Sequence, residues 1–134
     1  MRFFFDNTMS PALARAVAAL ESASDRNDVV HLRTKFAANT NDVAWIRALG
    51  QERDWVIVSG DLHIMRNPAE RAAWRESGLT AFFLKNAWAD QKLWLYAARF
   101  VGWWPHIVTQ AKIITKGKGF LVPFKSTRFE DVPQ

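Results

Sequence analysis

The sequence contains no cysteine among its 134 residues. Disulfide bonds, thiolate nucleophiles and cysteine zinc sites are therefore excluded, and this composition is typical of proteins from a reducing compartment. Long apolar runs are also missing, because no window approaches the roughly 20 apolar residues of a membrane span. The apolar start of the chain ends at Asp6, well short of the roughly 7–15 apolar residues at the centre of a signal peptide. We therefore expect a cytoplasmic protein that is not inserted in a membrane.

The motifs of several large enzyme classes are absent as well. The sequence has no G-x-G-x-x-G, Walker loop, G-x-S-x-G or H-E-x-x-H motif, and His31, His63 and His106 are not spaced as zinc ligands. The first two motifs bind phosphates through glycine-rich backbone, and the others carry a serine nucleophile or a zinc ion. P-loop enzymes and serine hydrolases of the triad type are therefore excluded.

Aromatic residues, by contrast, are plentiful. The chain has seven Trp and ten Phe, and 49% of its residues are hydrophobic. So many large side chains can bury enough area to stabilise one domain of this length without a covalent or metal cross-link. We predict a single domain over residues 1–134, with a core at about 2–111 and a basic C-terminal extension at 112–134.

Basic residues give the chain a formal net charge of +5. The extension carries a cluster of them, namely Lys112, Lys116, Lys118, Lys125 and Arg128. A basic patch raises the local concentration of polyanions and predicts salt-dependent binding of nucleic acid. The segment 116–119, with sequence KGKG, either contacts phosphates or is a solvated basic turn.

Alternating predicted strands and helices indicate the fold class. Apolar runs bounded by polar residues predict strands at 2–5, 29–32, 55–58 and 79–84, and helical periodicity predicts helices at 11–20, from about 41, at 68–78 and at 88–111. The first helix carries Leu13, Ala16, Val17 and Leu20 on its apolar stripe, and Pro105 should kink or split the last helix. Residues 120–123 either add an edge strand or cover the core. This order predicts an open, mostly parallel sheet wrapped by helices.

Three aspartates are placed where such a sheet binds ligands. Asp6 and Asp61 each follow a predicted buried strand, and the carboxyl ends of parallel strands meet at one edge. Asp42 lies three residues before Trp45 on the apolar stripe of its helix, so it should face the sheet. Converging carboxylates repel one another unless a hard divalent cation neutralises them. The sequence therefore predicts a site for Mg²⁺ or Mn²⁺, which can activate water against a phosphoryl group.

Each acidic residue also has a purely structural interpretation. Asp6 and Asp61 are turn formers after strands, and Asp42 is favourable at a helix N-terminus because of the helix dipole. Glu70 either completes a capping box with Asn67 or is an outer metal ligand. The aromatic stripe of the helix at 88–111 is either core or a platform for stacking bases.

Several segments together resemble the PIN-like superfamily. They are FFDN at 4–7 with SP at 10–11, NDVAWI at 41–46 and VSGD at 58–61, followed by IMRNPAER at 64–71 and LTAFFL at 79–84. The resemblance covers most of residues 2–110 and is closest to the short VapC-type toxin-like PIN domains. It implies a three-layer α/β/α fold whose central, mostly parallel sheet has four to five strands.

The resemblance also implies an activity and a site. PIN-like domains of this kind are Mg²⁺- or Mn²⁺-dependent ribonucleases, which implies that Asp6, Asp42 and Asp61 are catalytic metal ligands that position water against an RNA phosphodiester.

Four further residues have implied roles at the same site. Asn7 and Ser59 would hydrogen-bond the metal ligands, while Lys35 and Arg66 would neutralise substrate phosphates.

Three hypotheses for function follow. The first is a metal-dependent endoribonuclease, which as a toxin would have an antitoxin protein as its partner. The second is a PIN-like RNA-binding module without catalysis, because His63 and Asn39 stand where related sequences carry acidic residues. The third is a protein-interaction module or homodimer, in which the adjacent residues Trp103 and Trp104 form an exposed docking surface.

Overall fold

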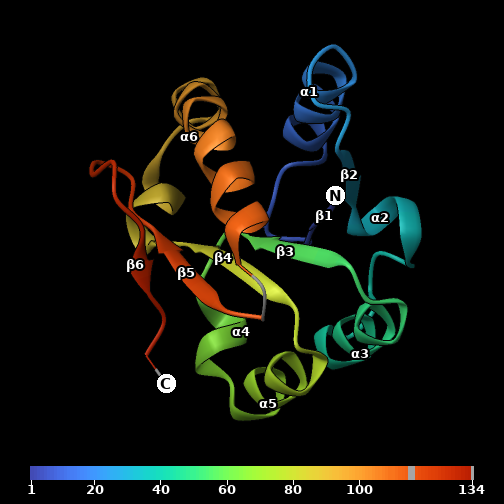
Figure 1. Ribbon diagram of the computed structural model, residues 1–134. Helices are drawn as coiled ribbons and strands as arrows, with labels where there is room; N and C mark the ends of the chain where they lie inside the picture. The colour runs from blue at the N-terminus through green and yellow to red at the C-terminus, as the bar shows by residue number, and fades with distance from the viewer. Residues whose placement is uncertain (115–116, 134) are drawn as a thin grey trace.

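The computed structural model describes residues 1–114 and 117–133 and has three layers, with one sheet between two layers of helices (Figure 1). The elements in chain order are β1 (Arg2–Phe5), α1 (Pro11–Ser22), β2 (Asp28–His31), α2 (Leu32–Lys35), α3 (Asp42–Glu52), β3 (Trp55–Ser59), α4 (His63–Arg66), α5 (Pro68–Ser77), β4 (Thr80–Leu84), the 3-10 helix η1 (Asn86–Asp90), α6 (Leu93–Ile113), β5 (Gly119–Val122) and β6 (Glu130–Asp131).

The sheet has the strand order β2-β1-β3-β4-β5-β6. The first five strands are parallel and β6 is antiparallel to β5. The expected mixed α/β fold with a mostly parallel sheet is confirmed. We expected four to five strands; the sixth, β6, has only two residues, which is too short for a periodic pattern to reveal.

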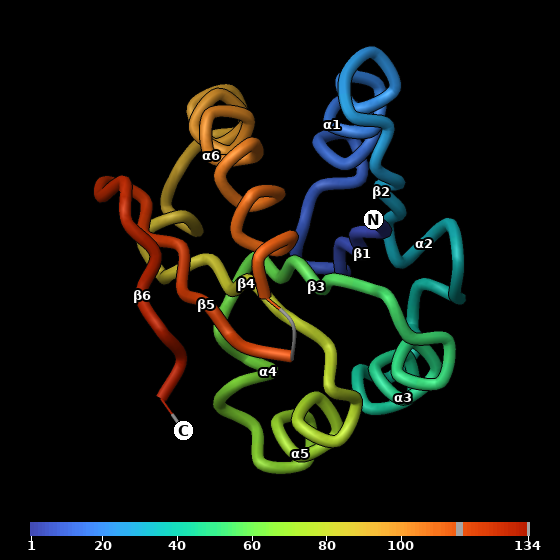
Figure 2. Tube along the Cα trace, viewed as in Figure 1, coloured from blue at the N-terminus to red at the C-terminus, as the bar shows by residue number. Residues whose placement is uncertain are grey.

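Helices cover both faces of this sheet. Helices α1 and α6 lie on one face, and α3 and α5 lie on the other (Figure 2). Because side chains of a strand alternate between faces, Phe3 and Phe5 join the core under α1 and α6, while Phe4 joins the core over α3 and α5. The central strands are buried from both sides, as expected for a parallel sheet.

The apolar stripe of α1 differs from the expectation by one position. Ala16 is exposed and Leu20 is 53% exposed, whereas Glu21 is buried. The Glu21 carboxylate accepts hydrogen bonds from Trp104 Nε1 at 2.7 Å and from the Asn27 backbone at 3.0 Å. Burial opposes ionisation, but these hydrogen bonds outweigh it and lower the pKa of Glu21. The buried face of α1 is therefore Leu13, Ala14, Val17 and Glu21, so Ala14 and the hydrogen-bonded Glu21 replace the predicted Ala16 and Leu20.

The last predicted helix begins later and is not split. Residues 86–90 form η1, in which Trp88 is buried and donates from Nε1 to the Val122 carbonyl at 2.9 Å. Helix α6 then runs through Pro105 to Ile113, so of the two outcomes expected for Pro105, a kink or a split, the split does not occur. Pro105 is exposed while Trp104 and Ile107 beside it pack in the core, and this packing outweighs the roughly 3 kcal/mol cost of an interior proline.

Trp103 and Trp104 are both buried, at 3% and 6% exposure, so the expectation of an exposed docking surface was wrong. Trp104 packs against Phe3 of β1, with ring centroids 4.7 Å apart. Trp103 faces the C-terminal segment instead and packs on Phe129 at 4.9 Å. Two adjacent helical residues can share one core here because this segment covers the flank of α6.

The C-terminal segment completes the sheet. The strand predicted at 120–123 is β5, but it is not at the edge, because β6 pairs with it. Of the basic cluster, Lys118 pairs with Asp131 at 3.8 Å, while Lys116 lies outside the described residues. No helix in the described part of the chain is both long and apolar enough to cross a membrane.

Candidate metal centre

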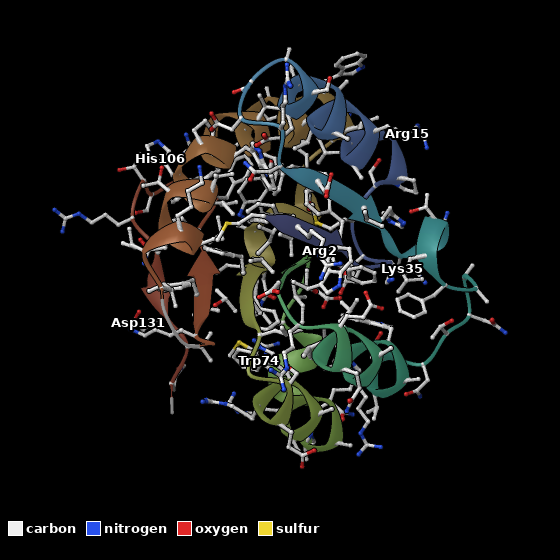
Figure 3. All side chains as sticks on the ribbon, turned by 45° about the vertical axis from the view of Figure 1, so that its right-hand side comes forward. Arg2, Arg15, Lys35, Trp74, His106 and Asp131 are labelled. Atoms are coloured by element: carbon white, nitrogen blue, oxygen red, sulfur yellow. The ribbon has the colours of Figure 1, made fainter. Side chains whose placement is uncertain are left out.

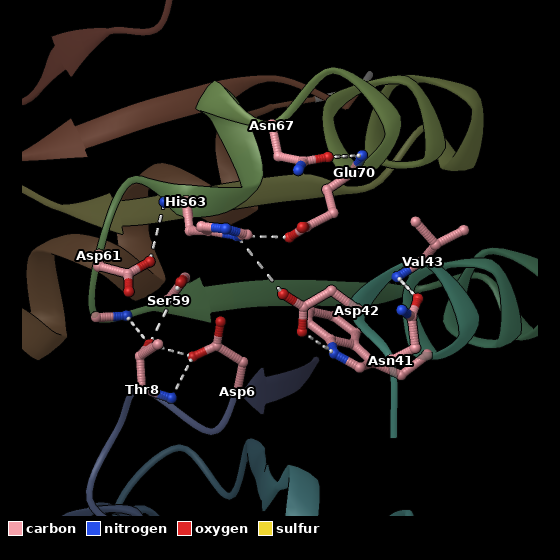
Figure 4. Close-up of polar contacts among 12 residues, drawn as sticks. Asp6, Thr8, Asn41, Asp42, Val43, Ser59, Asp61, His63, Asn67 and Glu70 are labelled. Atoms are coloured by element: carbon pink, nitrogen blue, oxygen red, sulfur yellow. Dashed lines mark hydrogen bonds and ion pairs between the residues drawn. The ribbon is translucent and has the colours of Figure 1, made fainter. Parts of the chain in front are cut away.

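Asp6 and Asp61 meet at the carboxyl edge of the sheet because their strands are neighbours. β1 and β3 are parallel, with Phe5 opposite Val58, and the Asp6 backbone N–H donates to the Val58 carbonyl at 3.2 Å. Asp61 follows two residues after the end of β3, in the turn that leads into α4. Figure 4 shows both side chains at these strand ends. The negative charge of Asp61 contributes to raising the pKa of Asp6, as expected for neighbouring carboxylates.

Asp6 is held by Thr8, a residue that the sequence analysis did not single out. The Thr8 backbone N–H donates to Asp6 Oδ1 at 3.0 Å, and the Thr8 hydroxyl donates to the same oxygen. The hydroxyl oxygen in turn accepts from the Gly60 N–H at 2.6 Å. A Cβ atom on Gly60 would lie 2.8 Å from the Thr8 carbonyl oxygen, so this close approach of the two loops requires glycine. The Asp-x-Thr spacing of an Asx turn was the available sequence signal.

The electrostatic environment of Asp6 is unfavourable for its charge. Asp6 is 3% exposed. Burial raises its pKa from 3.8 to about 6, and hydrogen bonds from Thr8 and Ser59 only partly oppose this shift. A bound cation at this edge would favour the ionised carboxylate.

Asp42 is the first residue of α3, and its half-buried side chain lies next to His63. Asn41 caps the helix by accepting from the Val43 N–H at 2.9 Å. Asp42 Oδ1 accepts from Trp45 Nε1 at 2.8 Å, and Trp45 is fully buried. The other oxygen, Oδ2, lies 3.9 Å from His63 Nδ1. The buried indole therefore orients the carboxylate at the mouth of the sheet.

His63 and Glu70 form one group of ligand atoms with Asp42, and this group does not include Asp6 or Asp61. The sequence analysis assigned neither His63 nor Glu70 to the primary ligands. His63 Nδ1 lies 2.9 Å from Glu70 Oε1. One ligand atom each from Asp42, His63 and Glu70 fall within 4.8 Å of one another. Asn67 caps α5 by accepting from the Glu70 N–H at 3.0 Å, but the Glu70 carboxylate turns toward His63 and does not close the capping box. The position of the Glu70 carboxylate thus fits a metal ligand and does not fit a capping box.

The pKa values within this cluster follow from burial and charge. Burial and the neighbouring Asp42 raise the pKa of Glu70, although His63 opposes the shift. The hydrogen bond with Glu70, followed by the negative charges of Glu70, Asp61 and Asp42, raises the pKa of His63. The cluster therefore already attracts one positive charge.

Asp61 also acts as a turn former. Its Oδ1 accepts from the His63 backbone N–H at 3.0 Å, just as Asp6 accepts from the Thr8 N–H. The turn-forming interpretation and a ligand role are compatible here, because each hydrogen bond uses one carboxylate oxygen.

The carboxylates outnumber the cations around them. Among residues 1–114 and 117–133, no lysine or arginine lies within 4.0 Å ion-pair distance of Asp6, Asp42 or Asp61. Carboxylate oxygens are the ligands that Mg²⁺ and Mn²⁺ accept in proteins. This excess of negative charge fits a divalent cation.

Ser59 and Asn7 were expected to hydrogen-bond the metal ligands, and only Ser59 lies beside one of them. Ser59 is fully buried, and its Oγ lies 3.4 Å from Thr8 Oγ1, beside Asp6. Asn7 instead donates to the Ala38 carbonyl at 2.6 Å and accepts from Arg33 Nε at 3.3 Å. It ties the end of β1 to the segment before α3, where Asn39 is exposed.

Of the two predicted phosphate contacts, the structure places only Arg66 near the site. Arg66 is exposed at the end of α4, three residues after His63. Lys35 pairs with Glu52 at 3.0 Å and its ammonium lies 5.4 Å from the Trp55 ring centroid, at the start of β3. Figure 3 shows it on the same side as Arg2. Glu52 attracts Lys35 toward the amino end of the sheet, away from the strand ends that carry the acids.

The fold and the site define an α/β domain with a cluster of carboxylates at the carboxyl edge of a parallel sheet. A family model described as a PIN like domain matches residues 1–86, and the chain belongs to the PIN-like domain family. Comparisons with curated proteins and with solved structures found no significant match. The family match is to PIN-like domains in general, so the closeness to VapC-type toxins stays a prediction.

Proposed function

We propose that this protein is a metal-dependent endoribonuclease that hydrolyses RNA phosphodiesters with Mg²⁺ or Mn²⁺ at the cluster described above. The observation that carries this proposal is the group of ligand atoms from Asp42, His63 and Glu70 within 4.8 Å of one another, next to Asp61 and to Asp6 at the end of the neighbouring strand. No lysine or arginine is paired with Asp6, Asp42 or Asp61 in the described part of the chain. Divalent-metal dependence is general among PIN domains, and the excess carboxylates are consistent with it.

Each residue has a role in this proposal. Asp6, Asp42, Asp61 and Glu70 would hold the cation, which when bound lowers the pKa of water and stabilises charge on the phosphoryl group. Thr8 holds one oxygen of Asp6 in place, and Trp45 does the same for Asp42. These buried contacts fix the ligand geometry before metal or substrate arrives.

Two arginines at the rim are suited to hold the RNA backbone. Arg66 is exposed beside His63, and Arg33 is exposed next to Asn7, which follows Asp6. Guanidinium groups bind phosphate oxygens through two parallel hydrogen bonds. The resemblance extends the proposal to the toxin of a toxin–antitoxin pair, in which an antitoxin protein would cover this edge.

Cleavage of labelled single-stranded RNA tests the proposal. Wild type should cleave with Mn²⁺ or Mg²⁺, and EDTA should stop the reaction. The double variant Asp6→Asn, Asp61→Asn should show only background cleavage, because two cation ligands lose their charge. Asp25→Asn is the matched control, since Asp25 is exposed in the loop after α1. Undiminished cleavage by the double variant would refute the assignment.

A specific observation favours one alternative, an RNA-binding module without catalysis. His63 lies in contact with Glu70 and near Asp42, so it neutralises part of the cluster. This alternative predicts RNA affinity that persists unchanged in EDTA and no cleavage with either metal. Electrophoretic mobility shifts with and without EDTA, run beside the cleavage assay, distinguish the two functions.

A further inference from the structure

His63 is placed so that a ring nitrogen, and not only its charge, faces the carboxylates. Its backbone N–H is tethered to Asp61, and its Nδ1 lies 2.9 Å from Glu70 Oε1 and 3.9 Å from Asp42 Oδ2. The close-up in Figure 4 shows the imidazole facing both carboxylates. One atom from each of the three residues lies within 4.8 Å of the others, which is the spread of ligand atoms around a single ion.

One histidine cannot balance the charge of the carboxylates at this edge of the sheet. Glu70 and Asp42 face the His63 ring, Asp61 bonds its backbone, and Asp6 lies at the end of the neighbouring strand. Asp6 is 3% exposed and its hydrogen-bond partners, Thr8 and Ser59, are both uncharged. No lysine or arginine in the described part of the chain lies within ion-pair distance of it. A buried carboxylate without a paired cation is a second, independent sign that a cation binds here.

We infer that His63 Nδ1 is a direct metal ligand together with Asp42 and Glu70, and that the site therefore prefers Mn²⁺ to Mg²⁺. The inference rests on the metal site of the proposed function and adds the nitrogen ligand and the selectivity. Mg²⁺ is a hard ion that takes oxygen ligands and retains its water, whereas imidazole suits first-row transition ions. Of the two ions proposed for this site, Mn²⁺ is therefore expected to bind more tightly to a ligand set of carboxylates and one imidazole.

Neither of the other two histidines belongs to a group of potential metal ligands among the described residues. His31 uses both ring nitrogens, since Nε2 bonds the Met9 carbonyl at 2.8 Å and Nδ1 accepts from the Arg33 N–H at 3.1 Å. His106 is exposed on α6 beside the Trp103 ring. A nitrogen signal on a bound ion would therefore identify His63.

Electron spin echo envelope modulation of the Mn²⁺-loaded protein tests the inference directly. Wild type should show ¹⁴N coupling to Mn²⁺, and His63→Gln should lose it. The matched control, His106→Gln, should keep it. Circular dichroism confirms that each variant is folded, which is expected because the His63 side chain is 61% exposed.

Selectivity gives a second readout that does not depend on catalysis. Titration calorimetry should give a lower Kd for Mn²⁺ than for Mg²⁺ in wild type. His63→Asp, which replaces the nitrogen with carboxylate oxygen, should bring the two Kd values closer together. His63→Gln should raise the Kd for Mn²⁺ by roughly 10-fold or more, since even outer partners of metal ligands contribute that much affinity.

The outcomes distinguish a failure of the His63 ligand assignment from a failure of the proposed function. Bound Mn²⁺ without ¹⁴N coupling, or coupling that persists in His63→Gln, would overturn the ligand role of His63 and leave the metal site intact. No binding of either ion by wild type, with or without RNA, would overturn both.

Discussion

Asp6 makes the clearest prediction at the scale of the single residue. Burial raises its pKa from 3.8 to about 6, so folding favours its protonated form. The stability gained from this protonation is complete below pH 3.8 and is lost as the pH rises through about 6. A shift of this size corresponds to about 3 kcal/mol. In EDTA at pH 7.5, Asp6→Asn should therefore raise the free energy of unfolding by up to about 3 kcal/mol.

The pH dependence distinguishes this effect from a simple packing change. Urea unfolding of wild type and Asp6→Asn should show a gain that is largest at pH 7.5 and nearly absent at pH 4. The Asn oxygen can still accept from Thr8, so the local hydrogen bond is kept. Asp25→Asn should change neither value. An equal gain at both pH values would contradict the electrostatic explanation.

At the scale of the element, β5 approaches α5 closely at one glycine. A Cβ atom on Gly119 would lie 2.5 Å from the Trp74 ring and 2.8 Å from a Val132 methyl group. Trp74 cannot move away easily, because its Nε1 donates to the Leu79 carbonyl at 2.8 Å and its ring packs on Phe83. Gly119→Ala should therefore lower the free energy of unfolding by about 1–3 kcal/mol, measured by urea denaturation.

A second glycine provides the matched control for this element. Gly102 is exposed within α6 and has no atom within 4 Å of a built Cβ. Gly102→Ala should raise the free energy of unfolding by about 0.5–1 kcal/mol, because alanine loses less entropy in a helix. If Gly119→Ala were neutral or stabilising, β5 would not be packed against Trp74 as described.

At the scale of the whole molecule, a basic chain with a net charge of +5 presents an acidic cluster at one edge. RNA binding to the rim should therefore depend on salt. On the inactive Asp6→Asn, Asp61→Asn background, each phosphate contact should contribute about −0.7 to the slope of log K against log salt for single strands. Arg66→Gln should reduce the slope by about that amount in fluorescence anisotropy titrations.

Lys35→Gln is the matched control for Arg66→Gln. Lys35 is paired with Glu52 at the start of β3, so its loss should leave the salt slope unchanged. A slope reduced by Lys35→Gln but not by Arg66→Gln would mean that RNA follows the opposite edge of the sheet.

The sequence alone determined the layers of this protein and much of its acidic edge. The apolar runs at 3–5 and 55–58 predicted strands buried on both faces. The carboxyl ends of neighbouring parallel strands lie at one edge of the sheet, which places Asp6 and Asp61 there. Helical spacing likewise predicted that Asp42 lies on the same side of α3 as Trp45, because the two residues are one helical turn apart. These properties depend on short segments of the chain, so the periodicity and spacing of residues were enough to predict them.

Tertiary structure decided what depends on contacts between distant segments. His63 meets Glu70 because the short helix α4 turns the chain back toward α5, and both meet Asp42 of α3 only after those helices pack on one face of the sheet. Lys35 is drawn away by Glu52, and Trp103 is covered by Phe129. Such partners are remote in sequence and carry no shared period, so only the packing of the elements brings them together.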